Sequence, residues 1–161
     1  MSVRKNERKQ SELEFIQNMN NLYHEIIVLL MKCPKRWDEL LVKPVSMAFT
    51  RALYHTKVGN SIYPTVQIER EERRLHFVQA LANLQAAITL LDGLFTFANS
   101  SQNDSGHTFK PETIDRIMQS MNLEIKLLKG VMTKDTRRFS SLGVSRNENK
   151  KNEDVKEKNK K

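Results

Sequence analysis

The sequence predicts an all-α protein, an up-and-down four-helix bundle with disordered basic tails. Three observations predict this fold. Apolar residues recur at steps of three and four in four separate segments, which is the period of an amphipathic helix. The 161 residues include only five glycines and four prolines, fewer than a β-rich chain with many tight turns needs. No segment shows the alternation of apolar and polar residues that indicates a strand.

The first helix is expected to begin at Ser11. Ser11 and Glu14 have the spacing of a capping box, in which a hydroxyl and a carboxylate satisfy backbone donors at a helix start. The apolar periodicity of this helix ends before Pro34, because a proline interrupts a helix. The apolar face of this helix comprises Phe15, Ile16, Met19, Leu22, Tyr23, Ile26, Ile27, Leu29, Leu30 and Cys33.

A second helix is expected over residues 38–58, after a short connection. Because Pro44 lies inside this segment, we expect either a kink or a helix that starts near Pro44. Gly59 and Asn60 then supply a helix stop signal. In the linker that follows, Tyr63 is expected to pack against the bundle.

The third helix is expected over residues 65–98, with Thr65 as its cap and a length of roughly 50 Å at about 1.5 Å per residue. Its apolar seam is Phe77, Leu81, Leu84, Ile88, Leu91 and Phe95. Leu75, Val78 and Ala82 are expected to widen the buried stripe. The polar run from Asn99 to His107 is expected to form a solvent-exposed loop.

The fourth helix is expected to start at Pro111, since proline fits a first helical turn. Its seam is Ile114, Met118, Met121, Ile125, Leu128 and Met132, which should pack on the third helix. Residues 140–161 are rich in Lys, Asn and Glu and are expected to be disordered. The domain organisation is therefore a basic tail over residues 1–10, a bundle over residues 11–139, and a second basic tail over residues 140–161.

The net charge of +8 is unevenly distributed: each predicted tail carries +3 and the bundle carries +2. The total charge alone therefore does not establish a nucleic-acid partner. Within the bundle, residues 32–57 and residues 126–138 are nevertheless predominantly basic. Solvated helix faces could also produce these clusters, and the second would complement the dipole at the end of the fourth helix.

The cysteine count and the distribution of apolar residues indicate where in the cell the protein is located. Cys33 is the only cysteine, which excludes an internal disulfide. The first ten residues are polar and basic, unlike a secretory signal, and the longest apolar run, residues 26–31, is too short to cross a membrane. We therefore expect a cytosolic protein with no membrane partner.

No catalytic or metal-binding motif is recognisable. No glutamate has a histidine three residues later, and HExxH and CxxC spacings are absent. The glycines lie too far apart to form a phosphate-binding loop. We therefore expect no metal, no cofactor and no catalytic residue.

One enzymatic alternative stays open. Arg70 and His76 have a spacing that resembles the pair of helical ribonucleases of the HEPN type. Six residues place the two side chains on different faces of a regular helix. Glu69, Glu71 and Glu72 would also oppose the approach of a phosphate. An exposed first turn with intrahelical ion pairs is the simpler interpretation.

Four segments together resemble a known family of small helical proteins. They are Leu22-Tyr23 through Leu29-Leu30, Pro34-Lys35-Arg36-Trp37, Gly59-Asn60-Ser61-Ile62-Tyr63-Pro64, and Arg73-Arg74 followed by Ala80-Leu81, Leu84 and Leu91. The family is the accessory variability determinant of diversity-generating retroelements, related in fold to four-helix proteins encoded in intervening sequences of ribosomal RNA. The resemblance covers roughly residues 11–138. Gly59 departs from it, since we expect alanine there.

The resemblance implies a non-enzymatic accessory subunit. Members of this family form basic homo-oligomers, typically pentamers, that bind a reverse transcriptase together with RNA and cDNA. They support the synthesis of mutagenised cDNA. None of these partners follows from composition or periodicity.

The leading hypothesis is a helical scaffold whose cations hold RNA or DNA phosphates, with weak sequence specificity and a steep salt dependence. Trp37 and Tyr63 could stack on bases, although packing anchors are the simpler interpretation. A third hypothesis is a structural bundle of a mobile element that binds a protein partner. The expected nucleic-acid-binding residues are Lys35, Arg36, Arg51, Lys57, Lys126, Lys129, Lys134, Arg137 and Arg138.

Overall fold

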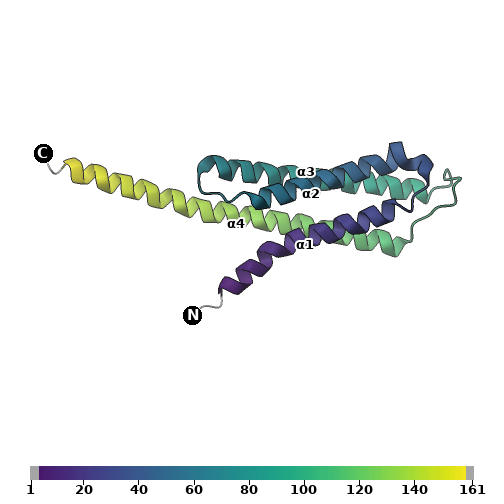
Figure 1. Cartoon of the computed structure of the whole chain (residues 1–161), viewed down its shortest axis with the longest axis horizontal. Coiled ribbons are helices and arrows are strands. Elements are labelled where there is room, and N and C mark those ends of the chain that lie inside the picture. The colour runs from purple at the N-terminus through teal and green to yellow at the C-terminus, as the bar shows by residue number, and fades with distance from the viewer. Residues whose placement is uncertain (1–3, 159–161) are drawn as a thin grey trace. The chain divides into compact units, whose positions relative to one another are not determined.

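The computed structural model describes the backbone of residues 4–158 and the side chains of residues 14–139. Over this range the chain is all-α, as predicted, and contains no strand. Its elements, labelled in Figure 1, are α1 (Arg4–Leu30), the 3₁₀ turn η1 (Lys35–Trp37), the π-helical turn η2 (Asp38–Val42), α2 (Lys43–Ser61), α3 (Gln67–Ala98) and α4 (Pro111–Lys158).

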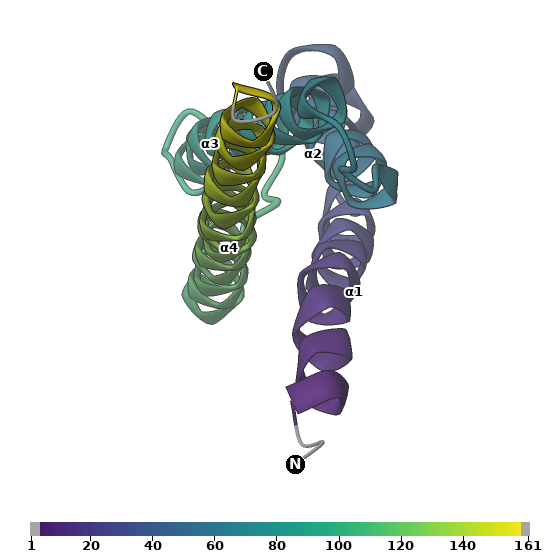
Figure 2. The same ribbon diagram turned by 90° about the vertical axis from the view of Figure 1, so that its left-hand side faces the viewer.

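The chain divides into two compact units, with a boundary inside α4. The first unit ends at Leu128 and the second begins at Lys129. Within the first unit, α2 and α3 form the most closely packed pair of helices, and α1 packs against α2 (Figure 2).

The helix α1 begins at Arg4, earlier than the predicted start at Ser11. Residues 4–10 of the predicted basic tail are therefore helical, while residues 1–3 lie outside the described part of the chain. Arg, Lys, Glu and Gln are good helix formers, and no proline or glycine interrupts this segment, so the helix propagates past Ser11 toward the N-terminus. Ser11 is consequently not the cap.

The two alternatives for Pro44 are resolved in favour of a helix start. α2 begins at Lys43, with Pro44 in its first turn, where the missing N–H costs no helical hydrogen bond. The helix then continues through Gly59 to Ser61. The prediction that Gly59 stops the helix was wrong, because Gly59 is buried within α2 and faces α3.

Gly59 allows α2 and α3 to approach each other closely. A Cβ atom at this position would lie 2.9 Å from Cε1 of Phe77 and 3.3 Å from Cβ of His76. The end of α2 is completed by Arg73 of α3, whose Nη1 donates to the carbonyl oxygens of Gly59 at 2.8 Å and Ile62 at 3.0 Å. The guanidinium also lies 4.8 Å from the centroid of the Phe77 ring.

The helix α3 has a cap different from the predicted one. It starts at Gln67, and the Glu69 carboxylate accepts hydrogen bonds from the backbone N–H groups of Thr65 and Val66. The Thr65 hydroxyl also donates to this carboxylate at 2.6 Å. These hydrogen bonds, that of the hydroxyl first, lower the pKa of Glu69. Thr65 therefore contributes to the helix start through Glu69, rather than as the residue that caps α3.

The core lies along one face of α3. Phe77, Leu84 and Leu91 of the predicted seam are fully buried, and Phe77 meets Phe15 of α1 edge-on, with ring centroids 6.0 Å apart. The stripe is widened by Ala80, Ala87, Leu94 and Ala98. The prediction that Leu75, Val78 and Ala82 widen it was wrong, because these three side chains are exposed on the opposite side of the helix.

The loop between α3 and α4 is exposed over much of its length, as predicted, and side-chain hydrogen bonds cross it. The Asn103 amide donates to the carbonyl oxygens of Ala98 and His107, each at 2.6 Å. Trp37 is 4% exposed and packs edge-on against Phe97 and His107, with centroids 5.4 and 5.6 Å away. Aromatic packing therefore joins this loop to the connection between α1 and α2.

The helix α4 begins at Pro111, as predicted, but it continues to Lys158 without a break. It therefore differs from the expectation of disorder over residues 140–161, of which residues 159–161 lie outside the described range. No proline follows Pro111, and Lys, Arg and Glu propagate a helix even when no core covers them.

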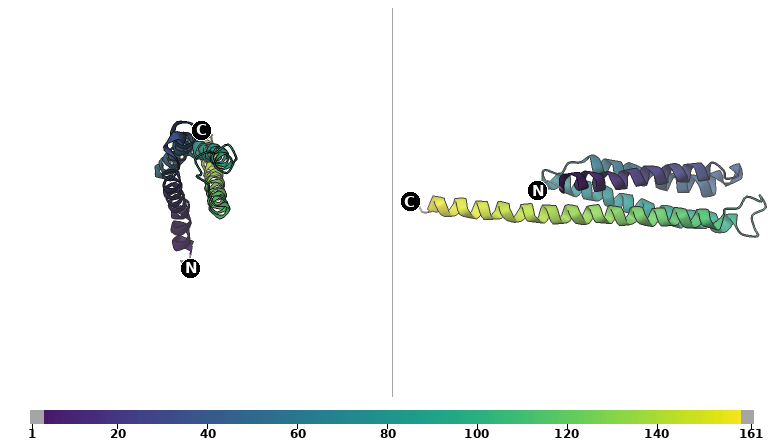
Figure 3. Two further views of the ribbon diagram at one scale, coloured as in Figure 1. Left: turned by 90° about the vertical axis from the view of Figure 1, so that its right-hand side faces the viewer. Right: turned by 90° about the horizontal axis from the view of Figure 1, so that it is seen from below.

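Within the first unit, polar contacts join α4 to α1. The Asn18 amide donates to Oε2 of Glu124 at 2.7 Å, and Arg116 forms an ion pair with Glu25. Figure 3 shows α1 and the first part of α4 from two further directions. These contacts place one buried carboxylate, Glu124, between the two helices.

By length and composition, α3 is apolar enough to cross a membrane, the only such helix among the described residues. Core helices of soluble proteins meet the same criterion. One third of its most apolar 18-residue window is buried inside the protein.

Candidate nucleic-acid interface

The second unit carries a basic face on α4. The side chains of Lys129, Lys134, Arg137 and Arg138 are all exposed. At about 100° per residue they fall within the same half of the helix. We call these four residues the α4 basic face. It presents cations along three helical turns of one continuous helix.

The helix dipole does not account for the α4 basic face. A cation interacts favourably with the dipole only in the last turn of a helix. The sequence placed these residues near the end of the fourth helix, but α4 continues to Lys158, five turns beyond Arg138 at about 3.6 residues per turn. The helix dipole therefore does not explain why this cluster is basic.

Lys126 belongs to the first unit and is also exposed. It lies on α4 near buried Glu124, but on the outward side of the helix. The spacing of Ile117, Met121, Glu124 and Leu128 defines the buried side. Lys126 is therefore an exposed cation that does not pack in the core of the first unit.

Lys35 and Arg36 lie together in η1, at the start of the connection that leads into α2. Arg36 forms an ion pair with Asp104 at 2.6 Å, in which both side chains are largely exposed. An exposed pair of this kind contributes little to stability. It does, however, place a carboxylate beside a cation that was expected to hold phosphate.

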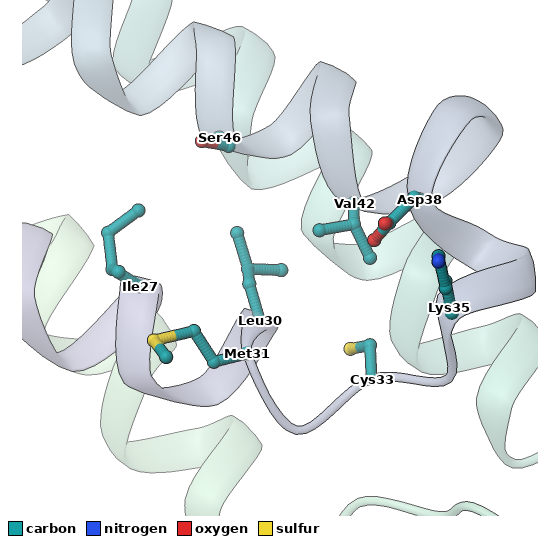
Figure 4. A pocket seen from close by; sticks show the side chains of 8 residues that line it. All are labelled: Ile27, Leu30, Met31, Cys33, Lys35, Asp38, Val42 and Ser46. Atoms are coloured by element: carbon teal, nitrogen blue, oxygen red, sulfur yellow. The ribbon is translucent and has the colours of Figure 1, made fainter.

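Lys35 also lines a cavity of about 450 Å³ (Figure 4). Its walls come from the end of α1, the connection and the start of α2. Burial, together with the charge of Asp38, raises the pKa of the Cys33 thiol to about 11. Cys33 is thus a protonated, poorly nucleophilic thiol at neutral pH. The complete lining is Ile27, Leu30, Met31, Cys33, Lys35, Asp38, Val42 and Ser46.

Arg51 and Lys57 are exposed on α2. Arg36 and Lys57 are 21 positions apart, which corresponds to about 30 Å along a helix. The structure therefore does not bring the four predicted cations of residues 32–57 into one site. Lys35 and Arg36 lie in η1, whereas Arg51 and Lys57 lie six residues apart on α2.

A pair of histidines lies beside Arg51. Nδ1 of His55 on α2 is 2.9 Å from Nδ1 of His76 on α3, so one ring donates a hydrogen bond to the other. Burial, His76 and Arg51, in that order, lower the pKa of His55. Tyr54 packs edge-on against the His55 ring, with centroids 5.0 Å apart. The described residues include no group of three or more potential ligands that could hold a metal ion.

The pair predicted for a HEPN-type ribonuclease is arranged differently from what that chemistry needs. His76 contacts His55, across the α2–α3 contact, rather than Arg70. Nε of Arg70 is buried, which leaves that atom inaccessible to a phosphate.

The two aromatic candidates for base stacking differ in exposure. Trp37 is a packing anchor, because it is buried against Phe97 of α3 and His107 of the α3–α4 loop. The expectation that Tyr63 packs against the bundle was wrong, since its side chain is 71% exposed. Tyr63 is therefore available to a ligand and Trp37 is not.

Sequence reasoning missed the roles of Arg73 and Glu124. The two adjacent arginines at positions 73 and 74 look equivalent in the sequence, yet only Arg73 caps α2. Glu124 could have been found from its spacing, because it continues the buried row of Met121 and Leu128 at steps of three and four.

Comparisons with family models, with curated proteins and with solved structures gave no match. A functional proposal for this chain therefore rests on its residues and on their geometry.

Proposed function

We propose that this chain is a non-catalytic accessory subunit that binds RNA or cDNA through phosphate contacts. The α4 basic face is the observation on which the proposal depends. It consists of four exposed cations on one half of a helix, at positions where neither the core nor the helix dipole requires them. Lys126, Arg51, Lys57 and Lys35 add cations on the first unit.

The polymerase partner comes from the resemblance described above. In this proposal the first unit is an up-and-down four-helix bundle that acts in the cytosol and presents a protein surface to a reverse transcriptase. The chain acts as a homo-oligomer, as accessory variability determinants do. The supporting residues are the Pro34–Trp37 junction and the Asn60–Pro64 segment.

Phosphate contacts imply a particular binding behaviour. Lysine and arginine neutralise phosphates without reading base edges, so the affinity depends weakly on sequence and steeply on salt. Tyr63, which is exposed, adds a surface on which an unpaired base can stack. Single-stranded RNA or cDNA is therefore the expected ligand.

The experiment is a charge reversal of the α4 basic face, with a matched control. The test variant carries Lys129→Glu, Lys134→Glu, Arg137→Glu and Arg138→Glu. The control carries Lys32→Glu, Lys43→Glu, Arg74→Glu and Lys110→Glu, which are four exposed cations outside the proposed interface. Each variant lowers the formal net charge from +8 to 0, so only the positions of the reversed charges differ.

Binding of single-stranded RNA is then measured against salt concentration. If all four residues contact phosphates, the slope of log K against log salt falls by about 3 in the test variant, because each contact contributes about 0.7. The control variant keeps most of the wild-type slope. Equal losses in both variants would mean that net charge alone attracts RNA, and the proposed interface would be wrong.

The same RNA distinguishes the two remaining hypotheses. Metal-free cleavage that His76→Ala abolishes would favour the ribonuclease, with His55 and His76 as its acid and base. A wild-type protein that neither binds nor cleaves RNA, but is captured by a protein partner, would favour the structural bundle. The proposed function expects binding without cleavage.

A further inference from the structure

A pair of histidines joins α2 to α3 at the edge of their closest contact. Nδ1 of His55 lies 2.9 Å from Nδ1 of His76, and both residues are half-buried. Gly59 follows His55 by one turn on the same side of α2, and the Cβ that it lacks would lie 3.3 Å from Cβ of His76. The absence of a side chain at Gly59 therefore lets the helices approach closely where the two rings meet.

The hydrogen bond between the two rings determines how many protons the pair holds. Two like nitrogens form such a bond only when one carries a proton and the other does not. The neutral pair therefore has one proton on the donating Nδ1 and one on Nε2 of the accepting ring. A first added proton can bind Nε2 of the donating ring and keep the bond, whereas a second must occupy the accepting Nδ1 and break it. The pair thus changes from neutral to positively charged in two steps as the pH falls.

The charged groups around the pair come from α2 and α3. Burial first, then His76, and then Arg51, which lies one turn before His55 on α2, lower the pKa of His55. The Tyr54 ring packs edge-on against both imidazoles. On α3 the nearest acidic position is Glu72, which is exposed one turn before His76. His55 is therefore mostly neutral at pH 7, beside a permanent cation, and acquires its charge only in acid.

The part of α1 that runs beside the pair is uncharged. It extends from Phe15, whose ring meets Phe77 of α3, to Tyr23, whose hydroxyl lies 3.4 Å from that of Thr50 on α2. Residues 15–22 contain no Asp, Glu, Lys, Arg or His. The two acidic residues of η2 precede α2 and are more than about 18 Å from the pair along that helix. Acid thus adds positive charge that no carboxylate of η2 or of this part of α1 neutralises.

We propose that this pair makes the phosphate contact at Arg51 dependent on pH. When the histidines are charged, two or three cations from two helices lie together on the first unit, and they hold phosphates of RNA or cDNA more tightly than Arg51 alone. Arg51 is among the cations assigned above to nucleic-acid binding, so this inference rests on the proposed function and adds its regulation. It predicts that this part of the interface strengthens in acid, whereas the α4 basic face, which contains no histidine, does not.

The test measures the affinity of the full chain for single-stranded RNA, at fixed salt, at about pH 5.5 and about pH 8. The affinity of the wild type is expected to rise in acid by about two- to fivefold for each histidine that gains a charge beside phosphate, as exposed ion pairs typically contribute. His55→Gln and His76→Gln are each expected to reduce this rise, because glutamine stays neutral. His24→Gln removes an exposed histidine of α1 and is the control, which should keep the rise.

A second measurement needs only the wild-type protein to bind RNA. NMR follows the His55 ring as the pH is lowered, with and without saturating RNA. RNA is expected to move the titration of His55 to higher pH, because a bound phosphate favours the charged ring. A titration that RNA leaves unchanged would overturn the inference. Circular dichroism at both pH values checks that each variant keeps its helices.

These results separate this inference from the proposed function. RNA binding that depends on the α4 basic face, but rises equally in acid in the wild type and in both variants of the pair, would overturn this inference alone. Acid-dependent binding that requires the pair, in a protein whose affinity the charge reversal on α4 affects no more than its control, would support this inference and overturn the role of the α4 basic face. A protein that binds RNA at neither pH would overturn both.

Discussion

Glu124 is a buried acid whose protonation controls part of the stability of the first unit. Its side chain has no solvent exposure. Oε2 accepts one hydrogen bond from Asn18, and Oε1 is buried without a hydrogen-bond partner. Burial outweighs the opposing effect of the Asn18 hydrogen bond and raises the pKa of Glu124 from 4.5 to about 7. We predict that Glu124→Gln stabilises the protein at alkaline pH.

The sign and size of the effect follow from this pKa. Glu124 releases its proton near pH 4.5 in the unfolded chain and near pH 7 in the folded one. The folded form therefore binds more protons between these values, and stability falls as pH rises through this window. Each pKa unit corresponds to about 1.4 kcal/mol, so the ionised carboxylate costs about 3 kcal/mol above pH 7. Below pH 4.5 this cost is absent, because the acid is neutral in both states.

The assay is urea unfolding of the wild type and of Glu124→Gln at one protein concentration, from about pH 5 to about pH 8. Glutamine is neutral and can still accept the Asn18 hydrogen bond through its Oε1. The free energy of unfolding of the variant is expected to exceed that of the wild type by less than about 1 kcal/mol at pH 5 and by about 2–3 kcal/mol at pH 8. Glu72→Gln, an exposed carboxylate on α3, is the control and should show no such trend. A difference between wild type and Glu124→Gln that does not change with pH would refute the reasoning.

Two further predictions use matched pairs of variants and urea unfolding. Gly59→Ala is expected to destabilise by about 1–2 kcal/mol, because the new Cβ would lie 2.9 Å from the buried Phe77 ring and overpacking outweighs the gain in helix propensity. Gly93→Ala is the control, because its Cβ would meet nothing within 4 Å, and it should stabilise the protein by about 0.5–1 kcal/mol. Equal effects of the two changes would contradict the close approach of α2 and α3. Arg73→Ala should cost about 1–3 kcal/mol, because its guanidinium donates to carbonyl groups at the end of α2. The control is Arg74→Ala at the exposed neighbouring position, which should change stability by less than about 0.5 kcal/mol. Equal losses of stability in the two variants would show that charge, rather than capping of α2, is responsible.

The sequence predicted the helices that have strong local signals. Pro111 fixes the start of α4, and Pro44 lies in the first turn of α2. These signals are local, because proline constrains its own backbone and has no N–H to donate. The outer ends of α1 and α4 lack such signals. Lys, Arg and Glu favour both helix and solvent, so composition alone does not distinguish a charged tail from a charged helix.

The choice of the buried side of α3 could not be predicted in full. Leu75, Val78 and Ala82 continue one apolar pattern, and Ala80, Ala87 and Leu94 continue another on the opposite side. A helix that is apolar on both sides contains no information about which side meets its own bundle. The side that contains Phe77 is the one that meets α2 at Gly59 and Phe15 of α1.

The sequence likewise does not show which cations of the candidate site have a structural role. Arg73 and Arg74 have the same side chain and adjacent positions, but Arg73 is used by the fold and Arg74 is exposed. A count of cations therefore overstates the surface available to phosphate, and each cation must first be tested for a structural role. For the α4 basic face the helix dipole gives no such role, since α4 continues to Lys158, and Arg138 also lies 5.9 Å from the centroid of the Phe139 ring. A basic cluster that lies several turns before the end of its helix is not explained by the helix dipole. Its position in the helix is therefore better evidence for a ligand than the number of its charges.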